Sequence, residues 1–104
     1  MRISLTEALQ QLNDSGAPFM ELFRHGTLQV ELYRPVGKDF QQPHTRDEVY
    51  VVISGSGEFF DGSETYQFHT GDVLFVKAGV AHRFEKFSEN FATWVFFYGP
   101  EGGE

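Results

Sequence analysis

Two histidines and one glutamate have the residue types of a metal site. His44 and Glu48 stand four residues apart, where a loop leads into an apolar run, and His82 stands at the start of another candidate strand. Imidazole nitrogens and carboxylate oxygens bind divalent first-row metals. Neighbouring strands lie only about 5 Å apart, so side chains at strand starts can converge. On residue types alone, these residues are more simply interpreted as solvated loop histidines and a strand-edge glutamate.

Composition excludes cysteine chemistry and argues against nucleic acid and membranes as partners. The chain of 104 residues has no cysteine, so disulfides, thiolate nucleophiles and sulfur-ligated zinc are excluded. The net charge is −7 and the eight Lys and Arg residues form no cluster, which argues against nucleic acid. No apolar run approaches the roughly 20 residues of a membrane span, and no basic-then-apolar leader is visible. We therefore expect a cytoplasmic protein that contacts neither nucleic acid nor membrane.

Side-chain alternation selects further candidates around Glu48. If Glu48 points inward along its strand, Tyr50 points inward as well. Tyr50 is then either a substrate contact or a buried structural tyrosine with a satisfied hydroxyl. Arg46 either closes over the mouth of the site and meets an anionic substrate, or forms an ion pair in solvent. His25 and His69 each stand beside a turn, so we expect both to be solvated.

The elements that must position these residues are mostly short strands. Helical spacing of Leu5, Ala8 and Leu12, with Ser4 as the cap, predicts a helix over residues 4–13. Apolar runs between Gly-rich turns predict strands at 28–33, 49–53, 57–60, 65–68, 73–76 and 91–98. Many short strands with tight turns favour an all-β sandwich or barrel, here one domain over residues 1–104. Residues 99–104 have no apolar anchor and predict a flexible tail.

The last predicted strand, 91–98, carries bulky residues on both faces. One face fills the interior of a barrel, so the other must pack on the helix, on the N-terminal strand or on a second copy of the chain. A homodimer is the expectation that follows.

Two segments resemble the paired motifs of the cupin family. In the segment from Gly37 to Gly55, Glu48 and Gly55 keep the motif spacing and His44 stands at the second histidine position. In the second segment, Gly71, Gly79 and His82 are in register. Three positions depart from the family pattern, with Gln42 in place of the first histidine, Lys77 in place of a proline and Lys86 in place of an asparagine.

The resemblance implies a double-stranded β-helix, which is a jelly-roll barrel of two facing antiparallel sheets, with the short helix packed outside. It implies one divalent ion, Fe, Mn, Ni or Zn, held by His44, Glu48 and His82. Gln42 then either coordinates through its amide oxygen, more weakly than imidazole, or leaves a water-filled position.

Cupins include dioxygenases, isomerases and binding modules, and a fold does not choose among them. The first hypothesis is a small metal-dependent enzyme of the dioxygenase or isomerase class that acts on a small oxygenated molecule. The second is a non-catalytic module that binds or senses a small molecule, with a structural metal or none. A weaker third hypothesis is a stable dimer with no catalytic role.

Overall fold

The computed structural model describes residues 1–39 and 41–104. One helix comes first and eight strands follow along the described part of the chain. Their bounds are α1 Leu5–Ser15, β1 Phe19–His25, β2 Leu28–Tyr33, β3 Asp47–Ser54, β4 Gly57–Phe60, β5 Thr65–Phe68, β6 Val73–Val76, β7 Arg83–Glu85 and β8 Ala92–Tyr98.

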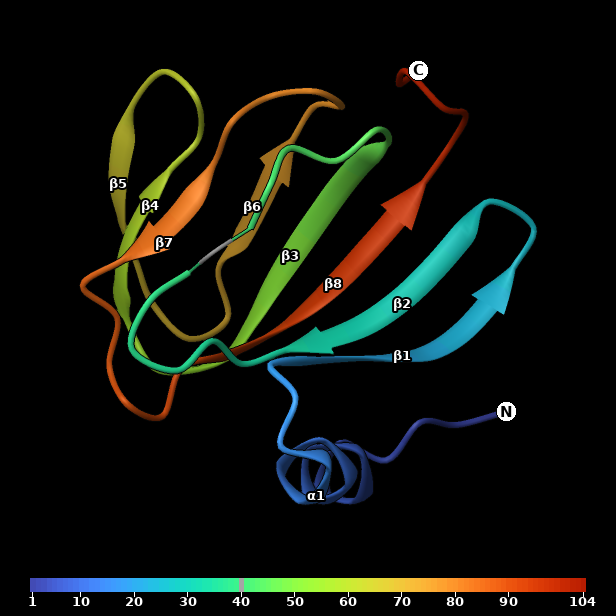
Figure 1. The fold of residues 1–104 in the computed structure, drawn as a ribbon, viewed down its shortest axis with the longest axis vertical. Helices are drawn as coiled ribbons and strands as arrows, with labels where there is room; N and C mark the ends of the chain where they lie inside the picture. The colour runs from blue at the N-terminus through green and yellow to red at the C-terminus, as the bar shows by residue number, and fades with distance from the viewer. Residues whose placement is uncertain (40) are drawn as a thin grey trace.

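The strands form two sheets (Figure 1). The larger sheet has the order β1-β2-β8-β3-β6 and the smaller has the order β5-β4-β7, with antiparallel pairing throughout. Neighbours such as β2 and β8 are far apart in the sequence, as in a jelly roll. The predicted all-β barrel with an N-terminal helix is confirmed.

Helix α1 covers part of the outer face of the larger sheet. Ala8 and Leu12 are buried there against Leu32 of β2, with Trp94 of β8 packed beside them. The Ser4 hydroxyl accepts a hydrogen bond from the Glu7 amide at 3.3 Å. The helix continues to Ser15, two residues past the predicted end, because Gly16 with φ of 72° closes it. No helix among the described residues is long and apolar enough to cross a membrane.

Strand β1 is the element that the sequence did not predict. A register shift between Glu21 and Phe23 marks a bulge in its pairing with β2. A bulge places an extra residue in one strand and breaks the alternation of apolar and polar side chains. The short strand β7, directly after His82, lies where a strand start was expected.

The interior between the sheets has two unlike halves. Toward the smaller sheet, aromatic rings fill the space, and we call this region the aromatic half. Phe84 lies at its centre, with ring centroids 4.7 Å from Phe91 and 4.8 Å from Phe59. Toward β1 and β2 the interior is open and its walls carry polar side chains, and we call this region the hollow half. The buried aromatic residues are Tyr33, Tyr50, Phe59, Phe68, Phe84, Phe91 and Phe97.

The C-terminal residues, predicted as a flexible tail, make hydrogen bonds to the loop before β3 and to its first residue. The Gly102 amide donates to the Thr45 carbonyl at 2.7 Å, and the Glu104 amide donates to the Asp47 carboxylate at 3.0 Å. Backbone hydrogen bonds therefore hold this segment, whereas the sequence-based expectation considered only apolar anchors.

Candidate metal centre

The structure brings His44, Glu48 and His82 together between the two sheets. Glu48 is on β3 of the larger sheet, His82 directly precedes β7 of the smaller, and His44 comes from the loop before β3. One ligand atom from each residue lies within 4.8 Å of the others. Glu48 Oε1 is 3.0 Å from His82 Nε2 and 4.0 Å from His44 Nε2. Ligand atoms on one ion at about 2.0–2.2 Å are themselves about 3–4 Å apart.

The Glu48 carboxylate is buried without hydrogen bonds. Its residue is 0% exposed, and among the described residues neither carboxylate oxygen has a hydrogen-bond partner. Buried polar atoms in native proteins are nearly always hydrogen-bonded, so an exception needs an explanation. A bound cation would satisfy both oxygens.

His82 directs its Nε2 atom toward Glu48. Its Nδ1 lies 2.9 Å from the Val80 carbonyl oxygen, which can only accept, so the neutral ring carries its hydrogen on Nδ1 and a lone pair on Nε2. Burial lowers the pKa of His82, but the Glu48 carboxylate and the Val80 carbonyl outweigh burial and raise it overall. Two atoms with lone pairs, 3.0 Å apart, need a positive charge between them, either a proton or a metal ion.

His44 is the ligand candidate nearest to solvent. Its side chain is 35% exposed, and its ring meets the edge of Phe97 at a centroid distance of 4.8 Å. Burial lowers the pKa of His44, although Glu48 opposes that shift. His44 is therefore neutral near pH 7, the form in which imidazole binds metals.

Tyr50 is fully buried beside the three residues, as the alternation predicted. Its hydroxyl lies 3.0 Å from Gln41 Oε1 and 3.1 Å from His82 Nε2. Burial and the nearby Glu48 carboxylate raise the pKa of Tyr50 well above its usual value, so the hydroxyl keeps its proton. The hydroxyl has partners within the protein, and a substrate contact by Tyr50 stays a prediction.

The glutamine beside the site is Gln41, not Gln42. Gln42 is exposed, whereas Gln41 Oε1 lies 3.3 Å from His44 Nε2. Gln41 is held by Asp39, a buried residue of the same loop. Neither Asp39 nor Gln41 is predictable from the sequence, because no spacing or motif marks them. A pair of adjacent glutamines gives no signal of which one turns inward.

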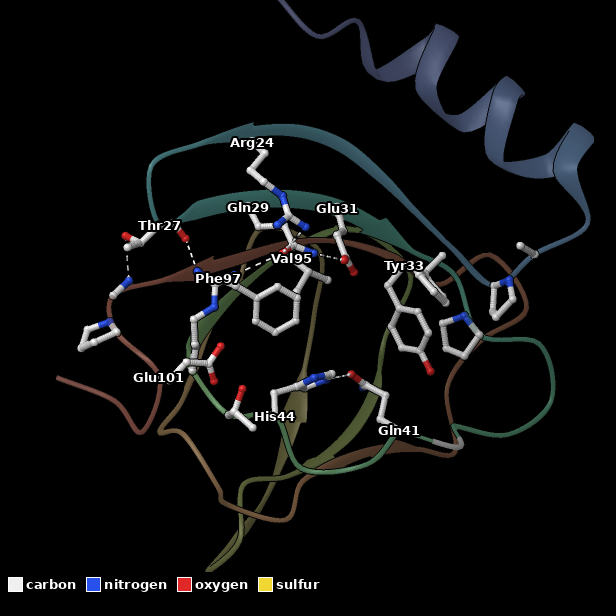
Figure 2. A pocket seen from close by; sticks show the side chains of 18 of the residues that line it. Arg24, Thr27, Gln29, Glu31, Tyr33, Gln41, His44, Val95, Phe97 and Glu101 are labelled. Carbon is white, nitrogen blue, oxygen red and sulfur yellow. Dashed lines mark hydrogen bonds between the residues drawn. The ribbon is translucent and has the colours of Figure 1, made fainter.

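A cavity of about 1010 Å³ opens from this centre along β2 (Figure 2). His44 and Gln41 form part of its wall, and Gln29, Glu31 and Tyr33 of β2 face it from the opposite side. Burial raises the pKa of Glu31, although the Gln29 amide donates to its carboxylate at 2.6 Å. The cavity therefore joins a partly buried carboxyl group to His44, the ligand candidate on its wall.

Arg46 also lines the cavity. Its guanidinium donates to the Thr27 carbonyl and to Gln29 Oε1, and its Cζ lies 6.0 Å from the centre of the Phe97 ring. It thus has the position expected of a residue that meets an anionic substrate, and that contact stays a prediction.

A model of the cupin domain matches residues 30–98, which is well over half of the chain. The chain belongs to the cupin family. It is 39% identical over 102 residues to the uncharacterized protein SCO3923 of Streptomyces coelicolor, covering 96% of this chain and 95% of that protein. The description of this relative names no activity.

Solved structures agree with the cupin fold. Protein NMB1881 of Neisseria meningitidis matches with a TM-score of 0.75 at 22% identity, covering 95% of this chain and 100% of that one. The DMSP lyase DddQ of Ruegeria pomeroyi matches with a TM-score of 0.65 at 23% identity, covering 78% of this chain and 46% of the lyase. A putative mannose-6-phosphate isomerase of Ralstonia eutropha matches with a TM-score of 0.58 at 26% identity, covering 78% of this chain and 83% of that one. Some cupins of this fold are therefore described as enzymes.

The cupin motif residues also have visible structural roles. Gly55 has φ of 88°, and a Cβ there would lie 2.7 Å from Phe91 Cα, so the close approach requires glycine. Lys86, which replaces the family's asparagine, has φ of 50°, a conformation that asparagine tolerates better than lysine.

The remaining histidines lie outside this cupin's candidate centre. His25 and His69 are exposed, in agreement with the sequence-based expectation. The Asp72 carboxylate accepts a hydrogen bond from the His69 amide at 2.7 Å, as a turn residue does.

The donor set of His44, Glu48 and His82 fits a divalent ion. The fit rests on the unsatisfied Glu48 oxygens and on His82 Nε2, which lies 3.0 Å from Oε1 while Nδ1 faces the Val80 carbonyl. Two neutral nitrogens and a carboxylate suit Fe, Mn, Ni or Zn.

Proposed function

We propose that this cupin is a metal-dependent enzyme that acts on a small oxygenated molecule. In this proposal His44, Glu48 and His82 hold one divalent ion, and the substrate reaches it through the cavity. The observation that carries the proposal is the Glu48 carboxylate, which is fully buried and without a hydrogen-bond partner among the described residues, 3.0 Å from His82 Nε2.

The ligand charges support an anionic or enediol substrate. One carboxylate and two neutral imidazoles leave a divalent ion with a net charge of about +1, so the ion would supply Lewis-acid attraction for substrate oxygens. Two histidines and one carboxylate are also the composition of non-haem iron oxygenase sites. His44 lies on the cavity wall while Glu48 and His82 are buried behind it, so substrate access is from the cavity side.

The cavity wall offers complementary groups for such a substrate. Arg46 provides a cation whose position is fixed by its bonds to Thr27 and Gln29. Gln29 uses its carbonyl for Arg46 and its amide for Glu31, so all three side chains are held in one network. A carboxylate of the substrate suits Arg46, and a substrate hydroxyl suits the free side of Glu31. Phe97 provides an apolar part of the cavity wall.

The likeness to other cupins supports catalysis without selecting a reaction. Proteins of this fold are described as a lyase and as a putative isomerase. A fold hosts many functions, so the dioxygenase or isomerase class assigned here rests on the donor set and the cavity.

Metal content tests the proposal first. Protein purified without chelators or an affinity tag should carry about one divalent ion per chain after exposure to Fe(II), Mn(II), Ni(II) or Zn(II), and His82→Ala should carry none. Oxalate, a small chelating dianion, should bind the loaded protein and not the metal-free protein in calorimetric titrations. Full metal retention in His82→Ala would overturn the proposal. Equal oxalate binding with and without metal would favour a non-catalytic binding module.

We further propose that two copies of the chain associate through the outer face of the larger sheet. Val73 and Phe75 of edge strand β6 are 66% and 50% exposed, and they pair with Val51 and Val49 of β3. Two chains of net charge −7 repel each other, so they should approach through this uncharged face. Light scattering should give a dimer mass for the wild type and a monomer mass for Phe75→Glu. A monomeric wild type at about 100 μM would contradict the proposal.

A further inference from the structure

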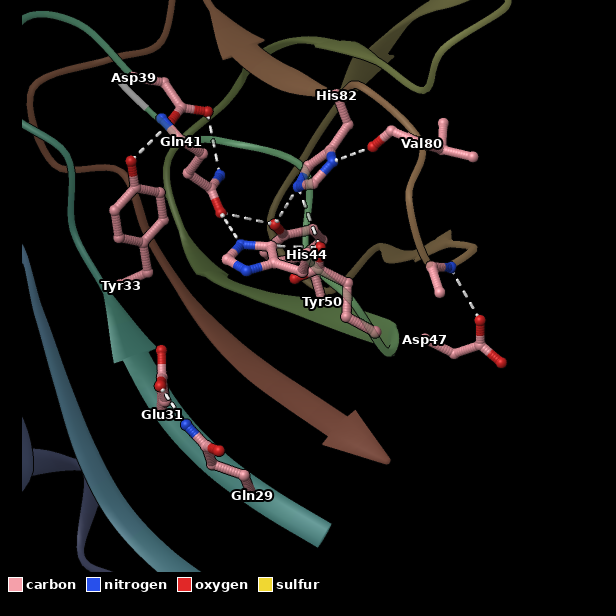
Figure 3. A network of polar contacts seen from close by, with 12 residues as sticks. Gln29, Glu31, Tyr33, Asp39, Gln41, His44, Asp47, Tyr50, Val80 and His82 are labelled. Atoms are coloured by element: carbon pink, nitrogen blue, oxygen red, sulfur yellow. Dashed lines mark hydrogen bonds and ion pairs between the residues drawn. The ribbon is translucent and has the colours of Figure 1, made fainter. Parts of the chain in front are cut away.

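Gln41 places an amide oxygen beside the metal-ligand candidates. Gln41 Oε1 lies 3.3 Å from His44 Nε2 and 3.0 Å from the Tyr50 hydroxyl, which is itself 3.1 Å from His82 Nε2. Figure 3 shows the Gln41 side chain directed toward His44 and Tyr50. The oxygen is therefore at the edge of the group that His44 and His82 form with Glu48.

Asp39 determines which end of the Gln41 amide faces the site. Gln41 Nε2 donates to Asp39 Oδ2 at 3.0 Å, and the Gln41 backbone amide donates to Asp39 Oδ1 at 3.0 Å. A carboxylate only accepts, so the amide nitrogen must face Asp39 and the amide oxygen must face the ligands. The usual ambiguity between oxygen and nitrogen in a glutamine side chain is thereby removed.

Asp39 is itself fixed from both sides of the barrel. It is 7% exposed, and it accepts hydrogen bonds from the Tyr33 hydroxyl at 2.6 Å and from the Phe84 amide at 2.8 Å. Tyr33 belongs to the larger sheet and Phe84 to the smaller. The orientation of Gln41 is therefore imposed by the folded barrel, as for a side chain that supports a metal site.

We propose that Gln41 supplies a fourth protein ligand through Oε1. The inference rests on the proposed metal site and adds to it. When His44 uses Nε2 as a ligand, this nitrogen no longer donates to Gln41, and a lone pair of Oε1 becomes available. Tyr50 continues to donate to the same oxygen, because a carbonyl oxygen accepts twice. An amide oxygen is a harder ligand than imidazole, so the site favours Mn(II) and Fe(II) more than a site with a third histidine would.

The adjacent glutamines provide a matched pair for a test. Cu(II) is loaded into Gln41→His and Gln42→His, and pulsed electron paramagnetic resonance counts the imidazole nitrogens on the metal. We expect three imidazoles in Gln41→His, and two in Gln42→His and in the wild type. Two imidazoles in both variants, or three only in Gln42→His, would overturn the proposal.

A second measurement uses the unaltered chain. In protein labelled with ¹³C at the glutamine side-chain carbonyls, Zn(II) should shift the Gln41 signal and leave the Gln42 signal in place. The variants Gln41→Ala and Gln42→Ala assign the two signals. Gln41→Ala should also weaken Zn(II) binding about tenfold, with Gln42→Ala within about twofold of the wild type. An unmoved Gln41 signal in the zinc-loaded wild type would overturn the proposal.

The two proposals fail in different ways. A wild-type chain that takes up none of these metals overturns the metal site and the fourth ligand together. A wild type that loads one ion and loses it in His44→Ala, with an unmoved Gln41 carbonyl signal, overturns the fourth ligand alone.

Discussion

The two halves of this barrel interior, one toward the smaller sheet and one toward β1 and β2, are packed in opposite ways. In the aromatic half, the ring centroid of Phe84 lies within 5.4 Å of those of Phe59, Phe68 and Phe91. In the hollow half, a cavity of about 1010 Å³ is lined by polar side chains such as Glu31 together with apolar ones such as Phe97. The difference indicates that dense packing at one end fixes the strands, so the other end can remain open and carry polar groups. The aromatic half thus stabilises the fold, and the hollow half holds the polar groups that could bind a ligand.

The aromatic half should carry most of the stability. Phe84→Ala removes ring contacts at the centre of this half, and we expect it to lower the free energy of unfolding by about 3–5 kcal/mol. Gln29→Ala, on the wall of the hollow half, should cost less than about 1 kcal/mol. Urea unfolding of both variants measures the contrast. Similar losses in the two variants would show that the halves share stability equally.

The metal site lies at the boundary of the two halves and should couple binding to folding. Zn(II) at about 100 times its dissociation constant should raise the free energy of unfolding by about 2.7 kcal/mol, because it binds the folded chain. Thermal unfolding with zinc and with a chelator measures this effect. His44→Ala should abolish the stabilisation, while His69→Ala, at an exposed histidine, should retain it. Zinc stabilisation that persists in His44→Ala would place the zinc elsewhere.

Glu31 should make the hollow half a source of instability. Burial raises its pKa in the folded state, so the folded chain holds this proton more tightly than the unfolded chain does. As the pH rises from the unfolded-state pKa of Glu31 to its raised folded-state pKa, the free energy of unfolding therefore falls. Above both pKa values this loss of stability is complete. Glu31→Gln should be more stable than the wild type at pH 8, with a smaller advantage at pH 4.5. Urea midpoints at both pH values test this, and an advantage that grows on acidification would contradict it.

The smallest expected effect concerns the end of β7. Lys86 has φ of 50°, where asparagine is less strained, so Lys86→Asn should stabilise the fold by about 0.5–1 kcal/mol. The variant also loses the exposed ion pair with Glu58 at 3.7 Å, which contributes little. Glu58→Gln measures that ion pair separately. A loss of stability in Lys86→Asn beyond that of Glu58→Gln would show that the backbone is not strained.

Sequence patterns predicted the strands of the barrel well and the loop around the site poorly. Strands β4, β5 and β6 have the predicted bounds, because tight turns delimit short apolar runs. His44, Glu48 and His82 converge as the motif spacing implied. The inward position of Gln41 instead depends on Asp39, whose partner Phe84 is 45 residues away in sequence. A hydrogen bond of that range leaves no periodic trace, and neither does the bulge that hid β1.

The unequal exposure of the three ligand candidates has a kinetic consequence. The His44 side chain is 35% exposed, while the side chains of Glu48 and His82 are 1% and 0% exposed. An incoming ion therefore meets His44 first and must pass it to reach the two buried ligands. Exchange of the ion with solvent should be slow in both directions and limited by movement of the loop that carries His44. Ions supplied first are then retained longest, so the metal found in the purified protein depends on the order of exposure as well as on affinity.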